Sequence, residues 1–378
     1  MAGNRTCEVM EINHEILLSL VRCSLWGTEP VYEHKPDWDR ILSLADQQTL
    51  TGLVAEAVPR LPKEYQPEAS HRLKLQSRVM KIYQSHALLN RKVAQTKQLM
   101  DAHGIHSVLF KGQGMALNYP NPLSRQCGDI DLYVGDRHFL DAMNILEPDE
   151  THDPSKYTHL KHFNTNSEGV EIEIHRIAEI IPGTARNRRF LNWTVSRLEG
   201  SDVRKEQIGG TEVNLPPVDF DAIYIMNHAW HHFMTGGIGL RQLCDWSIYL
   251  HRFHKQIDRE LLKENLKSFG LERAWQIFAG VAVRYLGLPA EECPLYTGAY
   301  DGKAAEVMEV IWSEGNFGKH SDYRKTPRPE GHFAGKLHSF KLNTSRIIRI
   351  LSISPADVTY SWIYYFINGM RNVFVRLK

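Results

Sequence analysis

The chain has 378 residues, of which 42% are hydrophobic and 24% are charged, and its formal net charge is +1. This composition is that of an ordinary soluble globular protein, and the length allows roughly two or three domains. The near-neutral charge excludes a global basic field, so a nucleic-acid partner would need a local basic patch.

The N-terminal region, residues 1–100, is predicted to be helical. Apolar residues recur at helical spacing over 11–26, 37–58 and 71–103. Gly104 follows the longest of these patterns, as is typical of a glycine that ends a helix. We therefore expect a set of helices before the first strand of the chain.

Residues 101–200 predict a small α/β core. Short apolar runs bounded by glycine indicate buried strands, and two alternating runs around a glycine-containing turn indicate a hairpin. In chain order the expected elements are a strand at 106–110, a turn and short helix at 111–120, a strand at 129–134, a helix at 136–147, and hairpin strands at 156–165 and 169–176.

Residues 215–378 are expected to form a helical C-terminal region. Amphipathic patterns cover 218–234, 239–253 and 258–287, whereas 300–335 is rich in glycine, proline and charge and predicts a flexible loop or lid. The expected fold class is thus α+β: a core with a small mixed sheet, flanked by helices from both ends and mostly α overall.

Acidic side chains alternate along two of the predicted strands. Asp129 and Asp131 flank one apolar residue, and Glu171, Glu173 and His175 alternate in the same way. Because successive side chains of a strand point to opposite faces, each set lies on one face of its strand. Two aspartates and a third acid from a neighbouring strand form a cage of hard oxygen ligands suited to Mg²⁺.

A glycine-bearing turn, Lys111-Gly112-Gln113-Gly114, lies upstream of these acids. Backbone amides after Gly112 could hold phosphates at the start of the following helix, and Lys111 and Arg125 are natural cationic partners for a triphosphate. Each feature alone is common in proteins without a ligand, since glycine usually marks a turn and alternating charges usually face solvent. Their order along the chain is what indicates a site.

This segment resembles the nucleotidyltransferase superfamily of the DNA polymerase β type, and more closely its bacterial group of uncharacterised nucleotidyltransferases. The flanking helical regions resemble that group too, through Trp38 and the pair His228 and His232. The residues that carry the resemblance are Lys111-Gly112, Tyr119-Pro120, Arg125, Gly128-Asp129-Ile130-Asp131-Leu132-Tyr133-Val134 and Glu173-Ile174-His175.

The resemblance implies a nucleotidyltransferase that moves a nucleoside monophosphate from a nucleoside triphosphate to an acceptor and releases pyrophosphate. It implies a two-metal mechanism with Mg²⁺ or Mn²⁺. The implied catalytic and metal-binding acids are Asp129, Asp131 and Glu173, and the implied nucleotide-binding residues are Lys111, Gly112, Gln113, Arg125 and His175. Glu171 stays open as the alternative third acid, and Gln113 stands where the wider superfamily has serine.

The acceptor and the activity itself leave alternatives open. A small molecule, a protein side chain or a transfer RNA 3′ end could accept the nucleotide, and no DNA partner is expected. A non-catalytic module that binds metal and nucleotide is the rival function, favoured by Gln113 in the phosphate turn.

Two pairs on predicted helices also have two interpretations. His228 and His232 are spaced i, i+4, which suits a metal or simple packing against the core, and packing is favoured. Arg241 and Asp245 have the same spacing and predict an ion pair within one helix. His175 either orients Glu173 or touches the nucleotide, or it is a structural histidine.

The five cysteines are widely separated and form no Cys-x-x-Cys pair, which argues against a zinc site or disulfide framework and for a reducing compartment. No apolar signal segment begins the chain, and no run of about 18 apolar residues occurs. We therefore expect a cytoplasmic protein without a membrane span.

Overall fold

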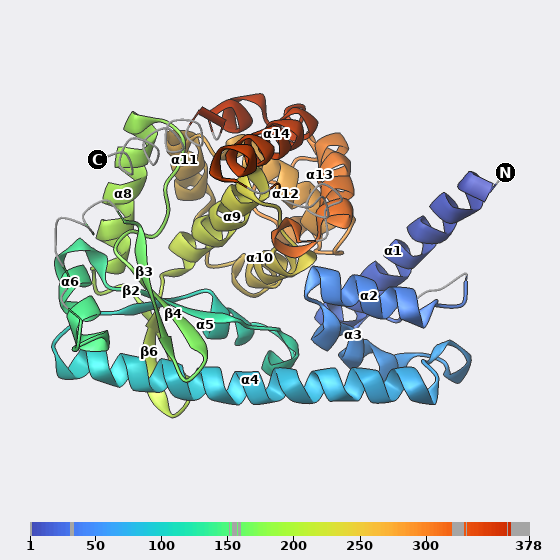
Figure 1. Ribbon diagram of the computed structural model, residues 1–378, viewed down its shortest axis with the longest axis horizontal. Coiled ribbons are helices and arrows are strands. Elements are labelled where there is room, and N and C mark those ends of the chain that lie inside the picture. The colour runs from blue at the N-terminus through green and yellow to red at the C-terminus, as the bar shows by residue number, and fades with distance from the viewer. Residues whose placement is uncertain are drawn as a thin grey trace.

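The structure is a computed structural model that describes residues 2–30, 34–150, 152, 157, 160–319, 329, 331–360 and 362–363. It confirms the predicted fold class, because a small mixed sheet is embedded among many helices (Figure 1). Among the described residues, no helix is both long enough and apolar enough to cross a lipid bilayer.

The N-terminal helices gather at one end of a single long helix (Figure 1). The elements are α1 (Ala2–Trp26), α2 (Trp38–Gln48), α3 (Thr51–Ala57), η1 (Val58–Arg60), η2 (Lys63–Tyr65) and α4 (Ala69–Ala102). Asp37 caps α2 by accepting a hydrogen bond from the amide of Arg40, which satisfies a free donor of the first turn. Helix α4 ends at the predicted glycine, since Gly104 has a left-handed φ of 69°.

The four-stranded sheet has the order β1 (Val108–Phe110), β2 (Asp129–Tyr133), β4 (Val170–His175), β3 (His162–Ser167). Strands β2 and β4 are parallel, and the two outer pairs are antiparallel. The surrounding short elements are α5 (Gly112–Ala116), η3 (Pro122–Ser124), α6 (Gly135–Leu146) and α8 (Thr184–Leu198).

A separate hairpin, β5 (Arg204–Ile208) and β6 (Thr211–Leu215), follows the core and was not predicted. Its turn is Gly209-Gly210, and both residues have positive φ, as the tight turn of a hairpin requires. The glycine pair between two alternating runs was the signal that could have identified this hairpin.

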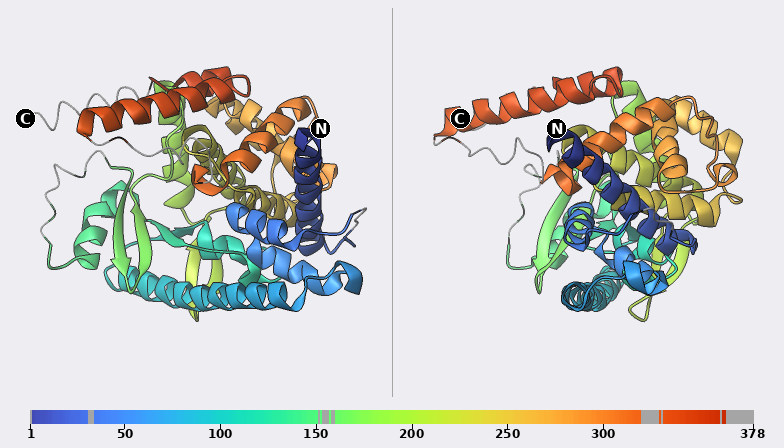
Figure 2. Two further views of the ribbon diagram at one scale, coloured as in Figure 1. Left: turned by 45° about the vertical axis from the view of Figure 1, so that its right-hand side comes forward. Right: turned by 90° about the vertical axis from the view of Figure 1, so that its right-hand side faces the viewer.

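The C-terminal region consists of packed helices, with α14 on the side of the molecule opposite α4 (Figure 2). The elements are α9 (Val218–Thr235), α10 (Leu240–Phe253), α11 (Arg259–Phe269), α12 (Glu272–Arg284), η4 (Ala290–Glu292), α13 (Asp301–Glu314), η5 (Asn316–Gly318) and α14 (His332–Ile350).

Helix α13 corrects the loop predicted over 300–335. Ala304, Val307, Met308 and Ile311 recur at helical spacing and are buried, so the first part of that segment packs as a helix. The predicted loop also includes 320–328 and 330, which lie outside the described residues, as do 364–378 of the expected terminal helix.

The two helical regions share one hydrophobic core that is distinct from the core under the sheet. Arg22 of α1 donates to the carbonyl of Tyr285, and Trp26 donates to the carbonyl of Leu286. The apolar face of the sheet, which includes Ile130, packs separately with residues of α4 and α6. Its other face meets α9 beside an aromatic cluster and carries the polar side chains.

Candidate active site

The predicted acids lie side by side on the sheet face that points toward α9. The parallel register of β2 and β4 aligns Asp129 with Glu171 and Asp131 with Glu173. Residues aligned in this way share a face of the sheet, so alternation on each strand brings the two sets together. Their apolar neighbours, including Ile130 and Ile172, fill the core on the other face.

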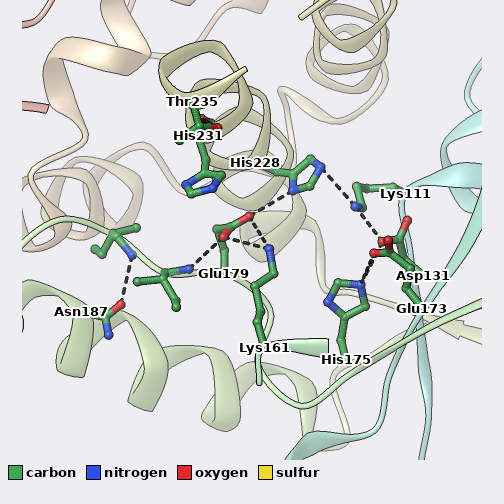
Figure 3. A network of polar contacts seen from close by, with 12 residues as sticks. Lys111, Asp131, Lys161, Glu173, His175, Glu179, Asn187, His228, His231 and Thr235 are labelled. Atoms are coloured by element: carbon green, nitrogen blue, oxygen red, sulfur yellow. Dashed lines mark hydrogen bonds and ion pairs between the residues drawn. The ribbon is translucent and has the colours of Figure 1, made fainter. Parts of the chain in front are cut away.

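Asp131 is the most enclosed of these acids, with an exposed fraction of 1%. Its Oδ1 lies 2.8 Å from Nζ of Lys111 and accepts a hydrogen bond from Nε2 of His175 at 2.9 Å (Figure 3). Burial raises the pKa of Asp131, but Lys111 and His175 outweigh burial and hold the pKa well below its usual value. Asp131 is therefore ionised at neutral pH.

The neighbouring acids carry negative charge that this lysine does not fully offset. Burial and the charge of Asp131 raise the pKa of Asp129 above its usual value. Burial also raises the pKa of Glu173, but the hydrogen bond with His175 brings it below its usual value. A divalent cation among these oxygens would relieve the repulsion between them, so the donor set fits such an ion.

Lys111 reaches the acids from a strained backbone position after β1. Its φ of 42° and ψ of −138° lie in a region that favours glycine, and such strain is concentrated at functional sites. The next residue must be small, because a Cβ on Gly112 would come within 3.3 Å of the carbonyl oxygen of Asp129. The turn thus brings the Lys111 side chain to the carboxylates. Burial lowers the pKa of Lys111, but Asp131 and Asp129 raise it overall.

A second buried carboxylate, Glu179, lies on the far side of Lys111 and was not predicted. Its two oxygens each lie 3.0 Å from Nζ of Lys161, and Nδ1 of His228 lies 3.1 Å from Oε2. The amide of Ile180 also donates to it. Burial raises the pKa of Glu179, but Lys161 and His228 hold it well below its usual value.

His228 joins the two groups of charges. Because its Nδ1–H donates to the carboxylate of Glu179, its Nε2 carries a lone pair that accepts from Lys111 at 3.1 Å. Burial and the charge of Lys111 hold the pKa of His228 well below its usual value, so the ring is neutral. Figure 3 shows the resulting chain from Lys161 through Glu179, His228 and Lys111 to Asp131.

A cavity of ≈ 380 Å³ lies between the sheet and the C-terminal helices. One wall carries the carboxylates. The other carries the imidazoles and cations of α9 and α10, with Phe317 of η5 beside them: His228, His231, His232 and Arg241. Carboxylates that face imidazoles and an arginine suit a metal complex of an anionic ligand.

Most of the predicted site residues line this cavity. They are Lys111, Gly112, Arg125, Asp129, Asp131, Glu173 and His175. Glu171 is exposed outside it and accepts from Asn164, so the structure places Glu173 and not Glu171 at the cavity. His175 lies 3.3 Å from Oε2 of Glu173, beside the acids.

The side chain of Gln113 is not at the cavity, in contrast to the prediction. It is 3% exposed and turns toward α4, where its amide donates to Asn90 and lies 3.2 Å from His86. A buried amide needs hydrogen-bond partners, and α4 supplies them for Nε2, whereas Oε1 has none among the described residues.

Two arginines have partners that differ from those expected. Arg125 is 5% exposed and forms a bidentate pair with Asp245, at 2.7 and 2.8 Å, so its guanidinium is not free for a triphosphate. The expected Arg241–Asp245 pair is therefore wrong, because Asp245 is occupied by Arg125 and Tyr119. Arg241 donates to the carbonyl of Gln126, and within the described residues its Nε has no hydrogen-bond partner.

A family model described as uncharacterised nucleotidyltransferase matches residues 34–287. A comparison with curated proteins found no match. Among solved structures, an antigenic nucleotidyltransferase-like protein from Paracoccidioides brasiliensis is similar to this chain at 12% sequence identity and a TM-score of 0.30. That likeness covers 58% of this chain and 95% of the other, and at such a TM-score it says nothing of function.

Proposed function

This chain belongs to the uncharacterised nucleotidyltransferase family, whose model matches more than half of it, and we propose that it transfers a nucleoside monophosphate from a nucleoside triphosphate to an acceptor. Pyrophosphate is the second product. The observation that carries the proposal is the alignment of Asp131 with Glu173 on parallel strands, with Asp129 on the same face and Lys111 within 2.8 Å of Asp131.

The acids Asp129, Asp131 and Glu173 would hold two Mg²⁺ or Mn²⁺ ions. When bound, such ions neutralise charge that develops on the reacting phosphate and lower the pKa of the attacking hydroxyl. The lowered pKa of Glu173 makes its carboxylate a weaker base, which favours a role as ligand over one as proton acceptor.

Lys111 and Arg241 would bind the phosphates. Lys111 keeps its charge despite burial, and neutral His228 fixes the position of its ammonium group by accepting a hydrogen bond. Arg241 lines the cavity and would take the place that the sequence assigned to Arg125. Cationic donors of this kind form strong hydrogen bonds to phosphate oxygens.

A non-catalytic nucleotide-binding module is the second candidate. It is favoured by the phosphate turn, where Gln113 replaces serine and turns its side chain into α4, and where α5 has only 5 residues. Such a turn offers few donors to the phosphates, so binding would depend on the cations around it.

The test incubates the purified chain with each of the four α-³²P-labelled nucleoside triphosphates, Mg²⁺ and cell extract as a source of acceptors. Transferred label and released pyrophosphate are measured, and the size of the labelled species separates a small molecule, a protein and a transfer RNA end. Asp129→Asn and Asp131→Asn should abolish transfer, and circular dichroism checks their fold. Glu171→Gln, on the same strand face outside the cavity, is the matched control and should retain it.

Equal transfer by the wild type and a folded Asp131→Asn variant would refute the proposal. Tight binding of a nucleoside triphosphate without release of pyrophosphate would assign the chain to the non-catalytic module.

A further inference from the structure

Two histidines lie next to Glu173 on the polar face of the sheet. The antiparallel register of β3 and β4 aligns His162 with His175 and Asn164 with Glu173. One ligand atom from each of His162, Glu173 and His175 lies within 4.8 Å of the other two. This spacing places two imidazole nitrogens and a carboxylate oxygen close enough to share one ion.

We propose that His162, Glu173 and His175 form a metal site with nitrogen ligands, which takes a transition-metal dication such as Mn²⁺ in preference to Mg²⁺. This inference rests on the proposed function and adds the class of metal that binds beside Glu173. Mg²⁺ takes oxygen ligands and water, whereas imidazole suits the first-row transition metals.

His175 is already placed among the oxygens that such an ion would need. The residue is 1% exposed, and its Nε2 lies 2.9 Å from Oδ1 of Asp131 and 3.3 Å from Oε2 of Glu173. The burial of the ring keeps this nitrogen beside the carboxylates. An ion bound to Glu173 would therefore meet this imidazole nitrogen.

The tautomer required for metal binding is open to His175. With Nε2 protonated, as its contact with Asp131 implies, the lone pair sits on Nδ1. A metal on Nε2 requires the proton to be on Nδ1 instead. Without a metal, Asp131 favours the proton on Nε2 of His175, so a bound ion would take the place of that proton. In the described part of the chain, the buried Nδ1 atoms of His175 and of His162 have no hydrogen-bond partner, so no contact at Nδ1 opposes a proton there.

The rival explanation is that the histidines only orient Asp131 and Glu173 through hydrogen bonds. The two explanations differ in one observable property, because a ligand nitrogen has a strong contact coupling to the bound ion, whereas a more distant nitrogen has only a weak dipolar one. Electron spin-echo envelope modulation of bound Mn²⁺ detects such a ¹⁴N nucleus.

The experiment uses the full chain, freed of metal by chelation and titrated with Mn²⁺ and, in competition, with Mg²⁺. The variants are His162→Gln and His175→Gln, with His103→Gln as matched control because His103 is exposed at the end of α4. We expect ¹⁴N modulation in the wild type and tighter binding of Mn²⁺ than of Mg²⁺. Each site variant should lose on the order of 10-fold in Mn²⁺ affinity with weaker modulation.

Bound Mn²⁺ without ¹⁴N modulation, or unchanged Mn²⁺ affinity in folded His162→Gln, would overturn the proposal. Should His175→Gln fail to fold, His162→Gln still decides, because its ring is only partly buried. Transfer of nucleotide without nitrogen coordination would refute the metal class alone. Nitrogen-coordinated Mn²⁺ without transfer would refute the enzymatic proposal alone.

Discussion

Glu179→Gln should destabilise the protein strongly, because three donors converge on this carboxylate. Glu179 is 1% exposed and accepts from Lys161, His228 and the amide of Ile180. Glutamine keeps the shape but removes the charge and turns an amide NH₂ toward a donor. Removing one partner of a buried ion pair costs about 3–5 kcal/mol. Because the Lys161 side chain is 22% exposed and can regain some water, we expect a loss of about 3 kcal/mol, at the lower end of that range.

The stability lost in Glu179→Gln should decrease as the pH falls. Lys161 and His228 hold the pKa of Glu179 well below its usual value of 4.5, so the folded protein binds this proton less readily than the unfolded chain. The carboxylate therefore stabilises the fold fully above about pH 4.5, and this contribution disappears as the pH falls through the folded-state pKa. The difference between wild type and variant should be largest at neutral pH and smaller at about pH 4.

Urea unfolding followed by tryptophan fluorescence measures this difference, since buried Trp246 and Trp275 report on the core. Glu212→Gln, which removes an exposed pair with Lys205, is the matched control and should leave the midpoint unchanged. A destabilisation by Glu179→Gln that is equally large at neutral and acid pH would refute the reasoning, because it would mean that the charge is not what stabilises the fold.

Three further substitutions test other parts of the structure. Arg241→Gln should weaken the binding of nucleoside triphosphate, measured by calorimetry, by about tenfold without changing the urea midpoint, because Arg241 lines the cavity and would supply a cation to the phosphates. Arg125→Gln should instead lower the unfolding free energy by about 3–5 kcal/mol, since it removes the cation that pairs with the buried carboxylate of Asp245. A stable Arg125→Gln variant with weak nucleotide binding would show that the roles of the two arginines had been exchanged. Gly52→Ala should cost about 1–3 kcal/mol, measured by urea unfolding, because its Cβ would lie 1.9 Å from the carbonyl oxygen of Ser124; an unchanged midpoint would contradict that packing.

The acidic face could be predicted because it depends on local alternation. Asp129 and Asp131 share a face whatever the partner strand, and Glu173 needs only a parallel neighbour in the correct register. Glu179 and Lys161 could not be predicted, since no spacing links them to each other or to His228. They meet because the folded chain brings Glu179, after β4, to His228 of α9 and to Lys161, before β3.

The arginines show a second limit of sequence patterns. Helical spacing permits a pair between Arg241 and Asp245, but it says nothing of a competing donor from another element. Arg125 lies in the loop before β2 and binds both oxygens of Asp245. This bidentate pair forms in place of the pair expected between Arg241 and Asp245 on one helix.

The average composition of residues 300–335 predicted a loop and obscured the helical pattern of α13. Gly, Pro and charge dominate 300–335 on average, yet Asp301–Glu314 contains apolar residues at helical spacing that are buried against the neighbouring helices. The hairpin of β5 and β6 was not predicted for a similar reason, because its strands carry many charged residues and lack the apolar runs that indicate buried strands.

The shared core of the two helical regions also has a consequence for biosynthesis. Arg22 and Trp26 bond to carbonyls 263 and 260 residues further along, so helix α1 leaves the ribosome long before its partners exist. Contacts of such long sequence separation form slowly, and the apolar faces they bury stay exposed meanwhile. Because α9 and α10 supply a whole wall of the cavity, a nascent chain has no complete site until most of the protein has been made. Truncated products of this chain should therefore be prone to aggregation and inactive, and their removal would depend on chaperones and proteases.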